Sequence, residues 1–507
     1  MKRKRPGIGV AAFLLLAGEA AAHFLPMSDI PVDRLITNIG KYVMLHPKDA
    51  NGHYTLGRVH SLAYVRAVDK VPARDEGSAD KLPYFIPDDG IPNIRGRSSF
   101  ERTGKALSAA QAIEHLALAV KSFETTVELD PLSAEHWMSM AYVLDVGSSH
   151  ALDVDFLPGL DAKRVVPTAV RKKLSPALKD LADPAKRDAA KRSIEDSADD
   201  GVLLVFQERE SLHGEASDAA RSIIQQHWRE RAIAAYLKAF QRSLRPDLKR
   251  DALMMGNEGL GELTSHEAGQ AYLRLVKARG ERSSDQAAID EVTKGLKELK
   301  DKKWGSYITP IVLSLKPTRV MSELISPVST AAFDLDGTGS GKRWPWVNAD
   351  TGILAWDPRQ TGDITSGRQL FGSASWWLLF DNGYRALDAL DDNRDGELLG
   401  TELKGLAVWF DRNSNGVSDP GEVIPVEQLG IAGIRTNATG IDGGSPCNRD
   451  GLRMADGRIL PTYDWIARSV PDSSESEPRL VAPLIVAGLV TPMLLAARRR
   501  RGCTSSC

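Results

Sequence analysis

The chain has 507 residues, of which 65 are Lys or Arg and 67 are Asp or Glu. Because these charges nearly cancel, the sequence lacks the basic surface expected of a nucleic-acid binder, and we expect no DNA or RNA partner. A content of 26% charged and 42% hydrophobic residues is typical of folded domains and excludes a largely disordered or fibrous chain.

The first segment of the chain has the order of a secretory signal peptide. MKRKRPG is cationic, GVAAFLLLAG is apolar, and Ala20 to Ala22 form a small-residue cleavage site before His23. We therefore predict a signal peptide over residues 1–22 and an exported protein. Because Glu19 lies late in the segment, an uncleaved anchor helix is the alternative, and in both cases the body of the chain leaves the cytoplasm.

Residues 23–150 carry helical periodicity in paired segments. In AIEHLALAVKSFETTVELDPLSAEHWMSMAYVLD, apolar residues recur every three or four positions on both sides of Asp130-Pro131, which predicts two helices joined by a tight corner. LITNIGKYVMLHPKDANGHYTLGRVH repeats this plan with Pro47 at the corner. A third and weaker match, RAIAAYLKAFQRSLRPD, lies within residues 151–324, where we expect a further helical region.

These paired segments resemble degenerate tetratricopeptide repeats. The resemblance implies a helical surface that binds a protein or peptide partner. Unrelated helical hairpins that pack for their own stability are the alternative interpretation.

Two acidic loops follow in the second half of the chain, DDNRDGELLGTE at 391–402 and DRNSNGVSDPGE at 411–422. Both carry oxygen-bearing side chains at loop positions one, three, five and twelve and glycine at position six, the spacing that calcium requires of a turning backbone. The predicted ligands of the first loop are Asp391, Asn393, Asp395, Glu402 and the main-chain carbonyl of Glu397. Those of the second loop are Asp411, Asn413, Asn415, Asp419, Glu422 and the carbonyl of Val417. The sequence therefore predicts two structural Ca²⁺ sites, of which the first is weaker because Leu399 occupies position nine.

The segment AFDLDGTGSGKRW at 332–344 allows two interpretations. Asp334, Asp336 and Thr338 stand at positions one, three and five of a partial calcium loop whose twelfth position is Pro345. The same two aspartates would be the nucleophile and the acid–base of a haloacid-dehalogenase-type phosphatase. We predict a protein that is not an enzyme. The phosphatase, and a non-catalytic interaction protein with vestigial loops, are the alternatives.

Residues 331–435 resemble the calcium-loop module of secreted bacterial adhesin-like proteins. The resemblance rests on FDLDGTG, WVNADTGILAWD, LFG, NGYRALDALDDNRDG, LAVWFDRNSNG and GEVIPVEQLGIAGI, in that order. It implies an EF-hand-like calcium-binding module at residues 325–445 and no catalysis. It also places a loop at Asp357, but Arg359 and Thr361 stand where Asn or Asp is usual. We therefore expect that loop to bind no ion, because a cation beside the metal is repulsive.

Six tryptophans are crowded into the same region: Trp344, Trp346, Trp356, Trp376, Trp377 and Trp409. They predict either the aromatic core of a small module or, at Trp376 and Trp377, a surface on which a carbohydrate could stack.

We expect a polar tether at residues 446–479, which is followed by an apolar segment, LVAPLIVAGLVTPMLLAA, at 480–497. Four arginines follow the apolar segment, which is typical of a membrane stop with its positive charge inside. We therefore predict a transmembrane or sorting tail over residues 480–501 and a single-pass anchor in the cell envelope or surface. The expected fold class is mainly α, with a tetratricopeptide-like N-terminal region, a small EF-hand-like module and a C-terminal transmembrane helix.

Overall fold

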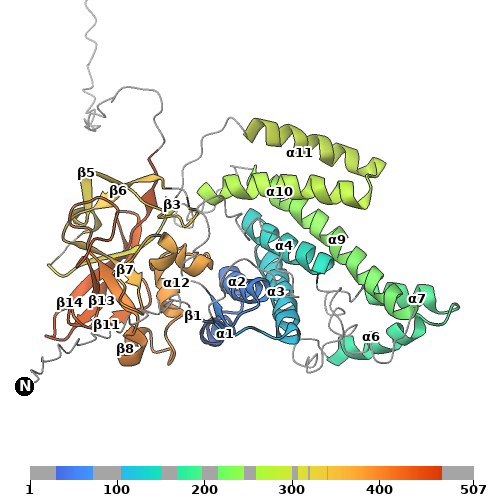
Figure 1. The fold of residues 1–507 in the computed structure, drawn as a ribbon, viewed down its shortest axis with the longest axis horizontal. Helices are drawn as coiled ribbons and strands as arrows, with labels where there is room; N and C mark the ends of the chain where they lie inside the picture. The colour runs from blue at the N-terminus through green and yellow to red at the C-terminus, as the bar shows by residue number, and fades with distance from the viewer. Residues whose placement is uncertain are drawn as a thin grey trace, which may run out of the picture. The chain divides into compact units, whose positions relative to one another are not determined.

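The computed structural model describes residues 30–71, 104–150, 168–196, 215–244, 258–299, 307–317, 320–339 and 341–470. Helices dominate the first part of these ranges, drawn in blue to green in Figure 1, and strands the second part, drawn in yellow to red. The helices are α1 (Val32–Leu45), α2 (Ala50–Arg66), α3 (Ala109–Leu129), α4 (Ala134–His150), α6 (Thr168–Asp180), α7 (Arg187–Glu195), α9 (Glu215–Ser243), α10 (Glu258–Arg279), α11 (Gln286–Leu299) and α12 (Gly383–Asp388).

Local capping explains where several helices begin. The Asp49 carboxylate accepts a hydrogen bond from the Asn51 amide at 3.0 Å at the start of α2. Before α3, the Ser108 hydroxyl accepts from the Gln111 amide and the Gln111 side chain accepts from the Ser108 amide. These contacts satisfy amides that have no partner inside the helix. The corner predicted at Asp130-Pro131 is confirmed, because α3 ends at Leu129 and α4 begins at Ala134.

The helices pack through small residues that admit large aromatic side chains. A Cβ atom at Gly57 of α2 would lie 2.8 Å from the Phe123 ring of α3, and one at Gly147 of α4 would lie 2.1 Å from the Trp228 ring of α9. Phe123 and Trp228 are almost completely buried. Only glycine therefore allows these helices to approach so closely.

The strands form one large antiparallel sheet and three small ribbons. They are β1 (Ile30–Pro31), β2 (Lys70–Val71), β3 (Tyr307–Ile308), β4 (Ile311–Ser314), β5 (Ile325–Ala332), β6 (Arg343–Val347), β7 (Thr351–Trp356), β8 (Glu397–Leu399), β9 (Leu406–Trp409), β10 (Val423–Pro425), β11 (Ile431–Arg435), β12 (Gly440–Asp442), β13 (Ser445–Met454), β14 (Ile459–Asp464) and β15 (Ala467–Arg468). The order in the large sheet is β10-β9-β7-β4-β14-β13-β11-β8, with β12 paired to β13. The ribbons pair β1 with β2, β3 with β15, and β5 with β6.

The expected fold class is therefore wrong, and so is the polar tether as far as residue 470, because β13, β14 and β15 lie there. The structure is about 47% helix and 21% strand, and a curled antiparallel sheet replaces the small helical module. The acidic loops are flanked by short apolar segments such as LAVW at 406–409 and IAGIR at 431–435, which are strands. Loop spacing specifies only the loop, and short apolar runs of this length suit strands as well as helices.

The first two helices share an apolar core with the sheet. Leu35 and Ile39 of α1 and Leu62 of α2 are buried in one cluster with Phe371 and Leu406. The Arg58 guanidinium of α2 also donates to the Trp377 carbonyl oxygen at 2.6 Å. All described residues belong to one compact unit. Residues far apart in sequence therefore build the surroundings of the acidic loops.

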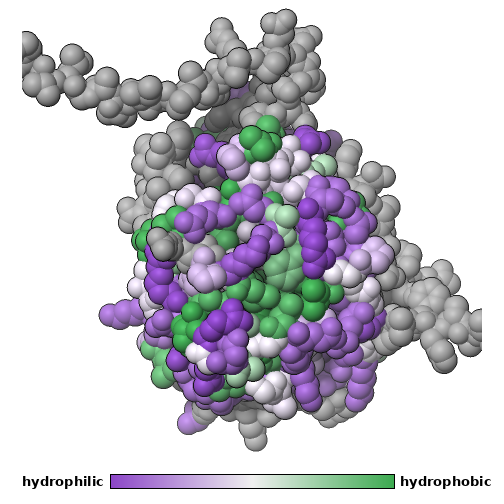
Figure 2. All heavy atoms as spheres, turned by 90° about the vertical axis from the view of Figure 1, so that its left-hand side faces the viewer, coloured by the Kyte–Doolittle hydropathy of each residue, from purple (hydrophilic) through white to green (hydrophobic). Residues whose placement is uncertain are grey.

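The six tryptophans between residues 344 and 409 are between 0% and 6% exposed. The aromatic core is therefore confirmed, and neither Trp376 nor Trp377 offers a stacking surface. Figure 2 shows hydrophobic side chains in the middle of one face, bordered by hydrophilic ones. Because none of the described contacts shows what would cover that face, we assign it no partner.

In the described residues no helix is both long and apolar enough to cross a bilayer. The predicted single-pass anchor, and with it membrane attachment at a cell envelope or surface, is therefore not supported. The segments behind the signal-peptide prediction (1–22) and the tail prediction (480–501) lie outside the described residues. Export stays a prediction.

Candidate functional site

The two acidic loops have the same backbone turn. The Gly396 amide donates to Asp391 Oδ2 at 2.9 Å, and the Gly416 amide donates to Asp411 Oδ2 at 2.8 Å. The backbone adopts positive φ at the fourth and sixth positions of both loops, 65° and 84° in the first and 58° and 75° in the second. The predicted role of glycine at position six is thus confirmed, because this conformation disfavours other residues.

The first and last carboxylates of each loop are buried against main-chain amides. Asp391 and Asp411 are 1% and 0% exposed, and Glu402 and Glu422 are 6% and 5% exposed. Glu402 accepts from the amides of Asp392 at 2.8 Å and Leu399 at 3.0 Å. Glu422 accepts in the same way from Arg412 at 2.8 Å and Asp419 at 3.1 Å. Each loop is therefore closed on itself by its twelfth residue.

Burial has an electrostatic consequence for the first carboxylate. It raises the pKa of Asp391 above its usual value, although hydrogen bonds from the Gly396 and Arg394 amides act in the opposite direction. A buried carboxylate without a balancing cation is costly, because charge is poorly solvated inside a protein.

The middle positions contribute further side-chain oxygens. In the first loop, Asn393 Oδ1 accepts from the Asp395 amide at 2.9 Å, and Asp395 Oδ1 accepts from the Glu397 amide at 3.0 Å. In the second loop, Asp419 Oδ2 accepts from the amide groups of Asn413 at 2.8 Å and Asn415 at 2.9 Å. Oxygen donors alone stand at the predicted ligand positions, which suits a hard cation such as calcium.

The side chain of Glu397 lies outside this set. Its carboxylate forms ion pairs with Arg453 at 3.0 Å and Arg435 at 3.5 Å. The predicted ligand was its main-chain carbonyl, as for Val417, so these ion pairs neither support nor contradict that role. The two arginines come from β13 and β11 and were not visible as partners in the sequence.

Two earlier loops repeat the same turn without a carboxylate at position twelve. Asp334 accepts from the Gly339 amide at 2.8 Å, and Asp357 accepts from the Gly362 amide at 2.8 Å. Their fourth and sixth residues, Gly337, Gly339, Gln360 and Gly362, all have positive φ. Among the described residues between 334 and 422, this acidic turn therefore occurs four times.

Cationic side chains occupy the first of these loops. The Lys342 ammonium lies 2.8 Å from Asp336 Oδ2, and the Arg368 guanidinium donates to the Gly337 carbonyl at 2.7 Å. The Thr338 hydroxyl donates to Asp336 Oδ1 at 2.8 Å. The partial site predicted from Asp334, Asp336 and Thr338 therefore lies beside two fixed positive charges. Lys342, at loop position nine, was readable in the sequence, whereas Arg368 comes from the neighbouring loop.

Asp334, the nucleophile of the alternative phosphatase, is held in place by a hydrogen bond. Asp334 Oδ2 accepts from the Ser366 hydroxyl at 2.6 Å. Burial raises the pKa of Asp334 to about 6, although the Ser366 hydrogen bond lowers it. These contacts do not test phosphatase activity, which stays an alternative prediction.

The arrangement of the acidic side chains does not support the metal-binding centre that the sequence predicts. Across the described residues, no three His, Cys, Asp or Glu side chains form a group that could hold a metal ion. In both acidic loops the buried carboxylates accept hydrogen bonds from main-chain amides. Several of the other side-chain oxygens in these loops belong to asparagines.

Most of this strand-rich region matches the model of one known protein family. The SPM domain family matches residues 312–452, which is less than half of the chain and includes both acidic loops. The iron-regulated protein FrpA of Neisseria meningitidis serogroup C is 32% identical over 146 residues. That match covers 27% of this chain, and the chain spans only 13% of the length of that relative.

The family expectation from the sequence is corrected by this match. The matching family is the SPM domain over a β-sheet region, and no EF-hand or calcium-loop module is shown. The matched range begins at residue 312, so it does not support the tetratricopeptide resemblance of the earlier helices. The acidic motifs were correctly placed in turns, but the family was inferred from the resemblance of several short motifs, and local motifs of this kind do not define a fold.

Proposed function

We propose that the loops at 391–402 and 411–422 each bind one calcium ion and that the ions stabilise the strand-rich region. The observation that supports this proposal is the repetition of one loop geometry with buried first and last carboxylates. Ordinary solvent-exposed turns have no need to bury two carboxylates each. Catalysis is not part of the proposal.

The carboxylates alone do not form a metal-holding group in the described residues, so the proposal depends on the Asn amide oxygens and main-chain carbonyls that complete each loop. Calcium takes six to eight oxygen ligands from carboxylates, amide oxygens and main-chain carbonyls. The side-chain donors are Asp391, Asn393, Asp395 and Glu402 in the first loop, and Asp411, Asn413, Asn415, Asp419 and Glu422 in the second. A bound ion would supply positive charge beside these carboxylates. The second loop has the additional carboxylate at position nine, so we expect it to bind more tightly.

The role proposed for calcium is structural. Calcium sites of extracellular proteins often have dissociation constants on the order of 10⁻⁴ to 10⁻³ M. The interaction surface predicted on the helices and the exported location stay predictions. The words iron-regulated describe FrpA, and we do not extend them to this chain.

The test is a calcium titration of the full chain by calorimetry, with thermal unfolding in calcium and in chelator. We expect two bound ions per chain and a higher Tm in calcium. Binding to the folded state alone stabilises it by about 2.7 kcal/mol at a hundredfold excess over Kd. Magnesium at the same concentration is the control and should shift the Tm less, because it demands strict octahedral geometry. An absence of both calcium heat and a calcium-dependent Tm shift would refute the proposal.

A further inference from the structure

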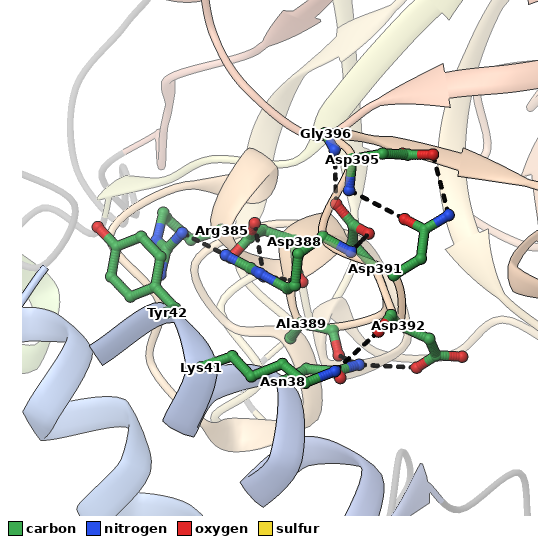
Figure 3. Close-up of polar contacts among 12 residues, drawn as sticks. Asn38, Lys41, Tyr42, Arg385, Asp388, Ala389, Asp391, Asp392, Asp395 and Gly396 are labelled. Atoms are coloured by element: carbon green, nitrogen blue, oxygen red, sulfur yellow. Dashed lines mark hydrogen bonds and ion pairs between the residues drawn. The ribbon is translucent and has the colours of Figure 1, made fainter. Parts of the chain in front are cut away.

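Helix α1 lies directly against the first acidic loop (Figure 3). The Arg34 guanidinium donates to both carboxylate oxygens of Asp392, at 2.8 and 3.0 Å, and to the Leu390 carbonyl at 2.8 Å. Asn38 donates to Asp392 Oδ1 at 2.8 Å and to the Ala389 carbonyl at 3.1 Å. These contacts connect residues more than 350 positions apart in the sequence.

Asp392 connects helix α1 to Glu402, the twelfth residue of the loop. The Asp392 amide donates to Glu402 Oε1 at 2.8 Å, while the Asp392 carboxylate is held by Arg34 and Asn38. The Asp392 carbonyl accepts from the Lys41 ammonium at 2.9 Å. All three polar groups of Asp392 are therefore engaged. Movement of α1 away from the loop would release the peptide that positions Glu402.

A second connection runs through Tyr42. Its ring lies 3.2 Å from the Arg385 guanidinium, measured to the ring centroid, and Arg385 pairs with Asp388 at 2.7 Å. The other oxygen of Asp388 lies 2.8 Å from the Arg394 guanidinium, and the Arg394 amide donates to Asp391 Oδ1 at 2.6 Å. Figure 3 shows Tyr42, Arg385, Asp388 and Asp391 in this order. The helix thus reaches both the first and the last carboxylate of the loop.

The second loop lacks this support. Its position two is Arg412, whose guanidinium donates to the Gly421 carbonyl of the same loop at 3.1 Å. None of the described contacts of residues 411–422 reaches α1. The two loops therefore share a backbone turn but differ in whether a remote helix holds them, and the second loop serves as a comparison inside the same molecule.

We propose that Arg34 and Asn38 are positioning residues for ion binding at 391–402, so that calcium binding in this loop and the seating of α1 strengthen each other. This inference rests on the proposed calcium function. Coupling of two equilibria is reciprocal: a seated helix raises calcium affinity, and bound calcium seats the helix by the same factor. Residues that orient metal ligands from outside typically contribute about tenfold to a hundredfold in affinity.

Substitution of Arg34 should leave the protein folded. Leu35 and Ile39 of α1 are 0% and 3% exposed and keep the helix in the apolar core that it shares with the sheet. Arg34→Met therefore removes the polar contacts and retains an unbranched apolar side chain. Arg458→Met is a matched control, because Arg458 also pairs with one aspartate and donates to one carbonyl, those of Asp456 and Leu315.

The experiment measures the two loops separately in the full chain. Glu422→Gln leaves 391–402 as the binding loop, and Glu402→Gln leaves 411–422. By calorimetry, Arg34→Met should weaken calcium binding about tenfold in the first background and leave it unchanged in the second. Arg34→Lys should recover part of the loss, because it keeps the charge but not the forked geometry. Arg458→Met should change neither background.

Hydrogen exchange of the α1 amides gives a readout independent of affinity. In the Glu422→Gln chain, calcium should slow exchange in α1, and Arg34→Met should remove this effect. Equal calcium affinity in the Glu422→Gln chain with and without Arg34→Met, together with calcium-independent exchange in α1, would overturn the coupling and leave the proposed calcium function standing. Absence of calcium binding to the unsubstituted chain would instead overturn the proposed function. An equal loss in both backgrounds would show a general destabilisation and would also overturn the coupling.

Discussion

The loops at 391–402 and 411–422 have the same turn but different supports. The second loop is held from within the strand-rich region: the Trp346 indole of β6 donates to Asp411 Oδ2 at 2.6 Å, and both side chains are fully buried. The first loop is held by Arg34 and Asn38 of a helix near the start of the described chain. The difference shows that the spacing of residues within the motif specifies the loop conformation. The contacts that hold the loop in place come from residues outside the motif.

Glu422→Gln should have the largest effect on the second loop. The substitution keeps the side-chain shape but removes the charge and one of the two ligand oxygens expected to close the calcium shell. We expect calcium affinity at 411–422 to fall on the order of a hundredfold or more and the first loop to bind as before. Calorimetry should therefore detect one site in place of two. Glu427→Gln is the control, because Glu427 is exposed and lies outside the loop.

Trp346→Phe should weaken the internal support of the second loop. It removes one of the two donors to Asp411 Oδ2, the Gly416 amide being the other, and is expected to cost about 1 kcal/mol of unfolding free energy. Calcium affinity at 411–422 should also fall roughly tenfold. The matched variant is Trp344→Phe, because Trp344 is equally buried but donates to the Phe333 carbonyl at 3.0 Å. A similar affinity loss in both variants would contradict a specific role for Trp346.

Asp464→Asn tests a contribution to the stability of the fold that does not depend on calcium binding in either loop. Asp464 is completely buried, its Oδ1 accepts from the Gly383 amide at 2.9 Å, and burial raises its pKa to about 8. An unfolded aspartate has a pKa of about 3.9. Because the folded-state pKa is the higher one, the contribution of Asp464 is fully present below about pH 4 and is lost as the pH rises through about 8.

The Tm of Asp464→Asn relative to the unsubstituted chain should therefore increase as the pH rises toward 8 and level off above it. Thermal unfolding in chelator measures this difference without a contribution from calcium. Asp450→Asn, at an exposed position of β13, should show no such trend. A Tm difference that does not vary with pH would contradict a neutral Asp464 in the folded protein.

Asp357→Asn should have the smallest effect on calcium binding. Its loop has the acidic turn, but Arg359 stands at position three and Arg368 at position twelve. We therefore expect the number of bound ions and both affinities to stay unchanged, since these cations disfavour a divalent ion. Calorimetry that detects the loss of a site would show that the turn alone suffices for binding.

Part of this organisation was predictable from the sequence. Glycine at the sixth position correctly predicted the turns at Gly396 and Gly416, and helical periodicity located the corner at Asp130-Pro131. The strands around the loops were missed, because runs of three to five apolar residues fit either helix or strand. The contact between Arg34 and Asp392 could not be inferred, since nothing local in either segment specifies a partner 358 positions away.

The core that α1 and α2 share with the sheet also sets the order in which the chain can fold. Leu35 and Ile39 lie in one apolar cluster with Phe371 and Leu406, so part of their surroundings is supplied by residues more than 300 positions later in the chain. Contacts of such high sequence separation slow folding, because a long chain segment has to be closed before they form. Until those contacts form, the apolar faces of these helices are exposed, and exposed apolar surface of this kind favours mispairing during folding.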